Sequence, residues 1–181
     1  MASRCLRHTC SPARRRGSAS ARSSTRSTAP RSRSSAATSC RRSGIMIETV
    51  KKEVVRPERG IHPLPWPYSH GIKVGNLLFI AGQVALDEEL RLIGPGDAEA
   101  QARQTWKNIQ TVVEAAGGKV TDVVRVTTYL ADLADVDAIH KVRREFFPSG
   151  DFPAATVVQA AKLGLPGLLL ETEAFAIIGC S

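Results

Sequence analysis

Two glutamates in the last predicted strand are the residues of this sequence best suited to chemistry. In "LLLETEAFAII" successive side chains point to opposite faces, so Glu171 and Glu173 share one face with three apolar residues, Leu169, Phe175 and Ile177. A carboxylate buried on such a face needs a partner or a raised pKa, and a carboxyl group with a raised pKa suits acid–base work on water. The simpler alternative is that both carboxylates reach the sheet margin and are solvated or paired.

Aromatic and histidine side chains supply a second set of candidates. Tyr68 and His70 follow "HPLPWP", a segment expected to be stiff and extended, and both could line a pocket. Equally, Trp66 and Tyr68 could only anchor an N-terminal arm. His140 lies beside the apolar stripe of a predicted helix, where a lone histidine is more often a surface or interface residue. No two histidines have metal-ligand spacing, so we predict no metal.

The elements that must position these residues alternate between strand and helix. Apolar residues spaced by three and four predict a helix between Asp97 and Gly117 and another between Asp135 and Pro148. Alternating and β-branched runs predict strands in four segments, 72–86 with a hairpin turn at Gly75-Asn76, 122–133, 154–163 and 168–178. We expect the last two strands to form an antiparallel pair.

This order of elements predicts an α/β fold, a mixed sheet with two helices on one face. The strands are rich in Val, Leu, Ile and Phe, so the opposite sheet face should also be apolar. Other subunits are expected to cover that face.

The charge of the sequence is unevenly distributed. Of the 25 basic residues, eleven are arginines within residues 1–45, which hold no Lys, Asp or Glu. Residues 46–181 therefore hold 14 basic and 17 acidic residues, a net charge of −3. This part of the sequence lacks the basic footprint of a nucleic-acid binder, so we predict no nucleic-acid partner.

Residues 1–45 are predicted to be a disordered tail, because Ser, Arg and Ala predominate and little apolar surface is available to bury. Three origins stay open: an organellar transit peptide, an Arg-rich nucleic-acid tail, or sequence upstream of the true start at Met46. The abrupt change of composition at Met46 favours the third origin, with the transit peptide second. Residues 46–181 are predicted to form the single folded domain.

Cysteine usage bears on the compartment. Cys180 is the one cysteine after residue 45, which fits a reducing environment and excludes a disulfide scaffold. No apolar run is long enough to span a membrane. We therefore predict a cytoplasmic protein, or an organellar one if residues 1–45 are a transit peptide.

Taken together, five segments resemble the reactive-intermediate deaminase (Rid) family, also called the YjgF or endoribonuclease L-PSP family. They are "PYSHGIKVGNLLFIAGQVALD", "GDAEAQARQTWKNIQTVVEAAGG", "VVRVTTYLADLADVDAIHKVRREFFP", "FPAATVV" and "LLLETEAFAI". The likeness covers nearly all of residues 60–178. It implies a chorismate-mutase-like α/β fold, a homotrimer with a small-molecule site between subunits, no cofactor, and hydrolysis of 2-imino acids to 2-keto acids and ammonia.

The resemblance also implies roles for individual residues. The glutamate that positions water falls on Glu171, and the tyrosine that closes the pocket falls on Tyr68. The substrate-binding turn, usually "SGQ", falls on residues 81–83, which read Ala81-Gly82-Gln83 here. An asparagine common on the second helix is replaced by His140. The arginine that clamps the substrate carboxylate in "PARS" is replaced by Ala155, because residues 153–156 read "PAAT".

The missing arginine separates this sequence from the usual pattern of the family. Arg–carboxylate pairs are bidentate and charge-assisted, so we expect a poor fit to the standard 2-imino acids. Lys162 is expected on the opposite face of the strand that carries Ala155, and His70 is a conceivable but weaker replacement. The leading hypothesis is a hydrolase acting on C=N bonds of a small imine, enamine or related metabolite. The alternatives are a non-catalytic metabolite-binding protein and, less favoured, a protein acting on RNA.

Overall fold

The structure is a computed structural model that describes residues 50–181. The predicted tail at residues 1–45 lies outside the described residues. The strands are β1 (Lys52–Val55), β2 (Gly71–Val74), β3 (Leu77–Gln83), β4 (Val123–Leu130), β5 (Ala154–Gln159) and β6 (Leu170–Ile177). The helices are α1 (Ala98–Ala115) and α2 (Val136–Phe146), with 3-10 turns η1 (Val120–Asp122) and η2 (Leu133–Asp135).

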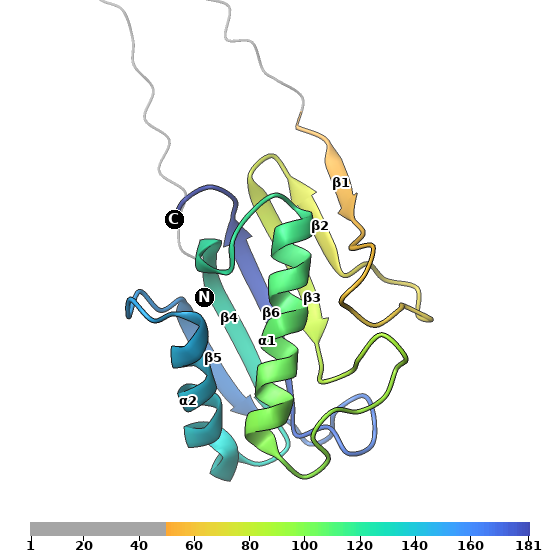
Figure 1. Cartoon of the computed structure of the whole chain (residues 1–181), viewed down its shortest axis with the longest axis vertical. Helices are drawn as coiled ribbons and strands as arrows, with labels where there is room; N and C mark the ends of the chain where they lie inside the picture. The colour runs from red at the N-terminus through yellow and green to blue at the C-terminus, as the bar shows by residue number, and fades with distance from the viewer. Residues whose placement is uncertain (1–49) are drawn as a thin grey trace, which may run out of the picture. The chain divides into compact units, whose positions relative to one another are not determined.

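The six strands form one mixed sheet in the order β1-β2-β3-β6-β4-β5 (Figure 1). All neighbours are antiparallel except β4 and β5, which are parallel and are connected through α2. The expected antiparallel pairing of the last two strands was wrong, because β6 inserts between β3 and β4 and never contacts β5 as a neighbour. The expected order also lacked β1, whose four residues are too few for a recognisable alternation.

The helices begin and end largely as the sequence predicted. The side chain of Asp97 caps α1 by accepting a hydrogen bond from the backbone N–H of Ala100 at 3.0 Å. After α1 the chain turns at Gly117, whose φ of +87° is a left-handed conformation that glycine adopts easily. Asp135 occupies the N-cap position of α2, as the sequence predicted, but its side chain makes no capping hydrogen bond. Asp132 caps the preceding η2 by accepting a hydrogen bond from the N–H of Ala134.

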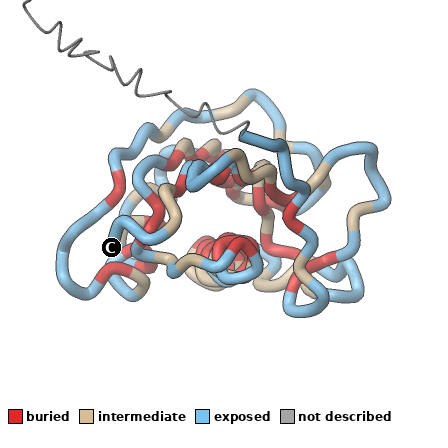
Figure 2. Tube along the Cα trace, turned by 90° about the horizontal axis from the view of Figure 1, so that it is seen from above, coloured by how far each residue is buried: buried red, intermediate tan, exposed pale blue. Residues whose placement is uncertain are grey.

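Both helices lie on the same side of the sheet, and the core lies between the two layers. Viewed from above, the buried residues of the sheet and of the helix face each other (Figure 2). The apolar stripe predicted for α1 is buried, and Trp106 and Ile109 at its centre are 2% and 0% exposed. Burial of such side chains stabilises the fold by roughly 1.5–3 kcal/mol each.

The opposite face of the sheet carries no helix among the described residues. In β6 the alternation is complete: Leu170, Thr172, Ala174 and Ala176 are buried, and the residues between them are not. On the open face Leu77, Phe79 and Phe175 are 46%, 43% and 36% exposed, and the two phenylalanine rings meet edge to face at 5.3 Å. The prediction of a sheet face without helices is confirmed for residues 50–181, but the face is apolar only in part, because Arg125 lies beside Phe175 and Thr127 beside Glu173 on it.

Within these residues, no helix combines the length and the apolar character needed to cross a membrane. The cytoplasmic location stays a prediction from the sequence.

Candidate functional site

A β-bulge in β3 brings the predicted turn and the predicted glutamate together. Ile80 pairs with Ala174 and Gln83 pairs with Thr172, so three steps along β3 match two along β6. The extra residue re-phases the strand, and Gly82 approaches the side chain of Glu171. A Cβ at Gly82 would overlap Oε1 of Glu171 and would lie 2.9 Å from its carboxyl carbon. The structure therefore requires glycine at position 82 while Glu171 keeps this orientation.

Gly82 and Glu171 line a pocket of about 240 Å³ together with Tyr68. The other lining residues are Trp66, Val84, Gly164, Leu165 and Leu168. Tyr68 is 47% exposed, and its ring stacks on that of Trp66 with the ring centres 6.2 Å apart. The walls are mostly apolar and one carboxylate enters from the floor, which is the usual composition of a small-molecule site.

The backbone N–H and carbonyl groups of Ala81 both make hydrogen bonds within the chain. Its N–H donates to the carbonyl of His70 at 2.9 Å, and its carbonyl accepts from Nε2 of Gln83 at 3.0 Å. Gln83 itself is fully buried beneath the sheet. Of the three residues of the predicted turn, only Gly82 lines the pocket.

Two buried amides of α1 hold the walls of the pocket, and sequence reasoning missed both. Gln101 donates from Nε2 to the carbonyl of Gly167 at 2.9 Å and accepts the N–H of Leu169 at 2.9 Å. Asn108 donates from Nδ2 to the carbonyl of Val84 at 2.9 Å. Their signal in the sequence was a polar residue on the buried side of an amphipathic helix, where an unpaired amide would be costly.

The Glu171 carboxyl group has the electrostatics of an acid–base group. Burial, and then the charge of Glu173 on the same face, raise its pKa above the usual range. No described residue hydrogen-bonds to its side chain or forms an ion pair with it, so the alternative of a paired Glu171 lacks a partner within residues 50–181. Solvation of the half-buried carboxyl group stays open. Burial, followed by the charge of Glu171, raises the pKa of the Tyr68 hydroxyl, which therefore stays protonated as a donor.

The two other predicted site residues lie elsewhere in the same protomer. His140 is on α2 and lines a separate pocket of about 210 Å³. Ala155 on the edge strand β5 pairs with Val126, which pairs in turn with Ala174, and both of those residues are fully buried on the helix side. Glu171 belongs to another row, with Tyr129 and Val158, on the open side. In one protomer, therefore, residue 155 and Glu171 lie on opposite faces of the sheet.

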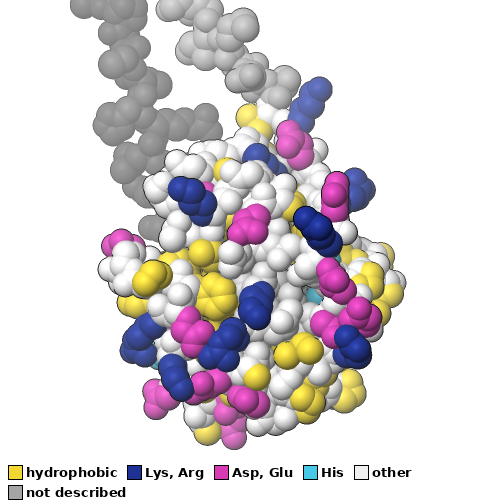
Figure 3. Space-filling view, in the orientation of Figure 1, with side chains coloured by type: hydrophobic (Ala, Val, Ile, Leu, Met, Phe, Trp, Pro, Cys, Tyr) yellow, Lys and Arg dark blue, Asp and Glu magenta, His cyan; other side chains and the backbone are white. Residues whose placement is uncertain are grey.

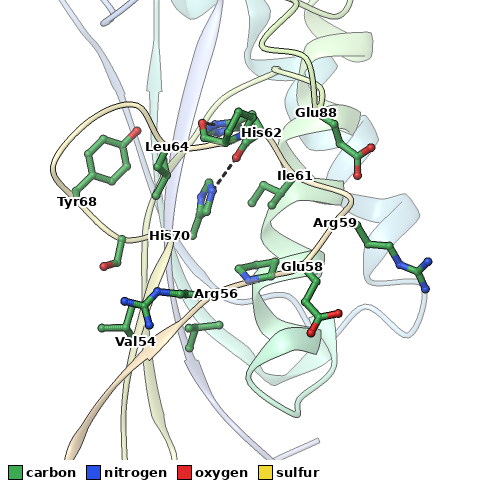
Figure 4. A pocket seen from close by; sticks show the side chains of 14 residues that line it. Val54, Arg56, Glu58, Arg59, Ile61, His62, Leu64, Tyr68, His70 and Glu88 are labelled. Atoms are coloured by element: carbon green, nitrogen blue, oxygen red, sulfur yellow. Dashed lines mark hydrogen bonds between the residues drawn. The ribbon is translucent and has the colours of Figure 1, made fainter.

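Neither Lys162, which was not expected to replace the missing arginine, nor His70, which was a conceivable replacement, lines the pocket of Glu171. Lys162 lies beyond the end of β5 in an exposed loop, so the strand alternation assumed for it does not apply. His70 is buried, and its Nε2 donates a hydrogen bond to the carbonyl of His62 at 2.9 Å (Figure 4). It lines a different hollow of about 610 Å³, bounded by the segment 54–70, rather than the pocket of Glu171.

No group of three or more His, Cys, Asp or Glu residues in the described part of the chain is arranged to hold a metal ion. The pocket at Glu171 instead has one carboxyl group, one phenol and a close backbone approach. Such an arrangement can hold a small polar molecule, take a proton from a bound water and return it to a leaving group.

Comparisons with known proteins agree with the fold. A RutC family protein of Pyrococcus abyssi is 40% identical over 125 residues, which cover 69% of this chain and 96% of that protein. The 2-iminobutanoate/2-iminopropanoate deaminase of Escherichia coli strain K12 is 35% identical over 113 residues, covering 61% and 87%. The crystal structure of E. coli TdcF with bound serine has a TM-score of 0.63 at 30% identity, covering 69% of this chain and 98% of that one.

The sheet of mixed direction with two helices on one face thus defines a protein of the YjgF/L-PSP fold. The sequence model described as Endoribonuclease L-PSP matches residues 63–178, which are more than half of the chain. The chain belongs to this family, as its motifs predicted.

Proposed function

We propose that the protein is a hydrolase that converts a small imine or enamine into the corresponding carbonyl compound and ammonia. The observation that carries this proposal is the Glu171 carboxyl group, which is half-buried, has a raised pKa and faces a small pocket beside Gly82 and Tyr68. Similar proteins named 2-iminobutanoate/2-iminopropanoate deaminase support the reaction class.

The proposed reaction needs one water molecule and no redox step. An enamine reacts as its imine tautomer. Glu171 in its ionised form accepts a proton from water as the oxygen attacks the carbon of the C=N bond of an imine that is protonated on nitrogen, which gives a neutral carbinolamine. Glu171 returns that proton to the nitrogen, the carbon–nitrogen bond breaks, and the hydroxyl proton passes to the departing ammonia as the carbonyl forms. The products are a carbonyl compound and an ammonium ion, and the carboxylate is regenerated. Tyr68 donates a hydrogen bond to the substrate and shields it from solvent.

The placement of the predicted residues supports a site shared between two copies of the chain. Glu171, Gly82 and Tyr68 lie at one pocket, whereas His140 and residue 155 lie on the helix side, where one protomer cannot bring them to Glu171. The uncovered, partly apolar face, with Phe79 and Phe175 at its centre, offers a surface for assembly. We propose a homotrimer in which each site combines the two halves.

The assay that tests this function uses an L-amino-acid oxidase to generate 2-iminopropanoate from alanine and follows the rate at which pyruvate forms. Wild-type protein should accelerate pyruvate formation, although slowly because Ala155 offers no guanidinium group to the substrate carboxylate, and Glu171→Gln, which keeps the size of the side chain but not its basicity, should remove the acceleration. A wider panel of imines then ranks the substrates. If the wild-type protein accelerates the hydrolysis of none of them, the proposal of a non-catalytic metabolite-binding protein takes its place.

Action on RNA has less support in the structure. On the face drawn in Figure 3, Lys and Arg side chains are interspersed with Asp and Glu, and no continuous basic patch is visible there. Phosphate binding depends on clustered positive charge, and the net charge of residues 46–181 is −3.

A further inference from the structure

Arg143 is a buried cation in a place where the fold does not require one. It lies in the last turn of α2, on the same buried side as Ile139 and Val142, and is 6% exposed. A guanidinium group stays charged in proteins, so its burial removes hydration that another group must replace. Burial lowers the pKa of Arg143, and no opposing contribution from a partner accompanies that shift.

The structure offers Arg143 no such partner within residues 50–181. Its Nε and Nη2 atoms are buried and make no hydrogen bond. Neighbouring charges are committed elsewhere: Arg103 pairs with Glu145 at 2.7 Å, and Lys141 pairs with Glu99 at 2.7 Å. An unpaired buried charge costs stability, and such costs are commonly retained at functional sites.

Arg143 lines a pocket suited to an anion. This pocket, of about 210 Å³, is bounded by His140, Arg143, Arg144 and Phe152, so its lining residues include two arginines and no Asp or Glu. His140 stands on the same side of α2 as Arg143 and Arg144, three and four residues before them. The pocket therefore combines a dominant positive charge with an aromatic wall.

The pocket also lies on the side of the sheet to which residue 155 belongs. Ala155 continues the row of Val126 and Ala174, whose side chains are buried under the helices. A methyl group at position 155 leaves room on this side, whereas the resemblance places an arginine there. The cation expected from strand β5 is thus absent, and an unpartnered cation is present on the neighbouring helix α2.

We infer that Arg143 is the anion-binding residue of the site and takes over, from α2, the role that the resemblance assigns to an arginine at position 155. The ligand it selects is a small molecule with a carboxylate, such as a 2-imino acid or its 2-keto acid product. This inference rests on the proposed function for the identity of the reacting group. The binding of the carboxylate itself does not depend on turnover.

The test is equilibrium binding of two probes that differ in charge, pyruvate and pyruvamide, measured by titration calorimetry. Wild-type protein should bind pyruvate more tightly than pyruvamide. Arg143→Met, which keeps the length of the stem, should weaken pyruvate binding at least about tenfold and leave pyruvamide binding unchanged. The pyruvate affinity of Arg143→Lys should lie between those of wild type and Arg143→Met, because an ammonium group keeps the charge but cannot make the bidentate contact. Lys107→Met, an exposed change on α1, is the control for net charge.

Thermal unfolding of the same proteins separates binding from structure. If Arg143 is held for a ligand, Arg143→Met should be as stable as wild type or more stable without ligand, and pyruvate should raise the Tm of wild type and of Lys107→Met but not that of Arg143→Met. The inference is overturned if Arg143→Met binds pyruvate as wild type does, or if wild type does not prefer pyruvate to pyruvamide. If the protein prefers pyruvate through Arg143 but hydrolyses no imine, the proposed function is wrong and the inference about Arg143 stands.

Discussion

Gly82 and Glu171 approach each other so closely that a single methyl group at position 82 would overlap the carboxylate. The contact crosses the bulge between β3 and β6, where the backbone rather than a side chain forms the wall of the pocket. The position of the proposed acid–base group is therefore set by a residue that has no side chain.

The first prediction follows from this contact. Gly82→Ala should reduce kcat/KM for imine hydrolysis at least about tenfold, because Glu171 must move to admit the Cβ, and a displacement of about 1 Å is enough for such a loss. Stability should fall by about 1–3 kcal/mol, as for other crowded substitutions. Steady-state kinetics and urea denaturation measure the two effects. Combining Gly82→Ala with Glu171→Gln should cost no more activity than Glu171→Gln alone, whereas additive losses would show that Gly82 acts independently.

The second prediction concerns pH. Glu171 must be ionised to accept a proton from water, and burial together with Glu173 raises its pKa. The rate should therefore decline as pH falls, with a midpoint above the pKa of an ordinary glutamate. Glu173→Gln removes the neighbouring negative charge, lowers the pKa of Glu171 and should shift the acid limb of the kcat/KM profile to lower pH. An acid limb that stays in place in this variant would mean that another group controls it.

The third prediction concerns stability and uses Asp122, which is the last residue of η1, directly before β4, and is 1% exposed. Burial alone would raise its pKa, but hydrogen bonds from the backbone N–H groups of Gly179, Lys119 and Ser181 reverse this and lower the pKa to about 2. Because the folded-state pKa is depressed, the ionised group stabilises the fold above the unfolded pKa of 3.8, and this contribution disappears as pH falls toward 2.

Asp122→Asn should accordingly lower the free energy of unfolding by roughly 2 kcal/mol at pH 7. The difference between wild type and variant should narrow as pH falls from about 5 toward 2. Urea denaturation across this range measures it. A constant difference at all pH values would assign the loss to packing or hydrogen-bond geometry rather than to ionisation.

The sequence predicted the layers of the fold because periodicity reports burial directly. The stripe of α1 and the alternation of β6 both correspond to the observed faces. Strand neighbours were not predictable in the same way. The place of β6 between β3 and β4 is a long-range pairing, and nothing local in residues 168–178 distinguishes it from a hairpin with β5.

Individual site residues were predictable only where they belong to a motif or to a recognisable pattern of burial. Glu171 and Tyr68 were candidates from their residue types and positions, the resemblance gave roles to them and to Gly82, and the structure places all three at one pocket. Arg143 attracted no notice, because an arginine in the last turn of a helix normally faces solvent and stabilises the helix dipole. Only its burial and its lack of a partner within residues 50–181 distinguish it.

The last prediction tests whether two copies of the chain share each site. Residue 155 and Glu171 lie on opposite faces of the sheet, so a site that uses both must draw them from different protomers. Glu171→Gln removes the acid–base group from the part of the site that one protomer supplies. Ala155→Glu places a carboxylate in the part that the neighbouring protomer supplies, where it should repel an anionic substrate. Each variant alone should therefore be inactive toward 2-iminopropanoate.

Co-expression of the two variants in equal amounts should restore activity. In randomly mixed trimers, about one quarter of the interfaces would bring together a protomer with an intact Glu171 and a protomer with an intact Ala155. About one quarter of wild-type activity is therefore expected. Light scattering before and after mixing verifies the assembly, and mixing the separately assembled proteins without exchange of subunits is the control. A site contained in one protomer could not recover activity in this way, because every chain would still carry one damaged half.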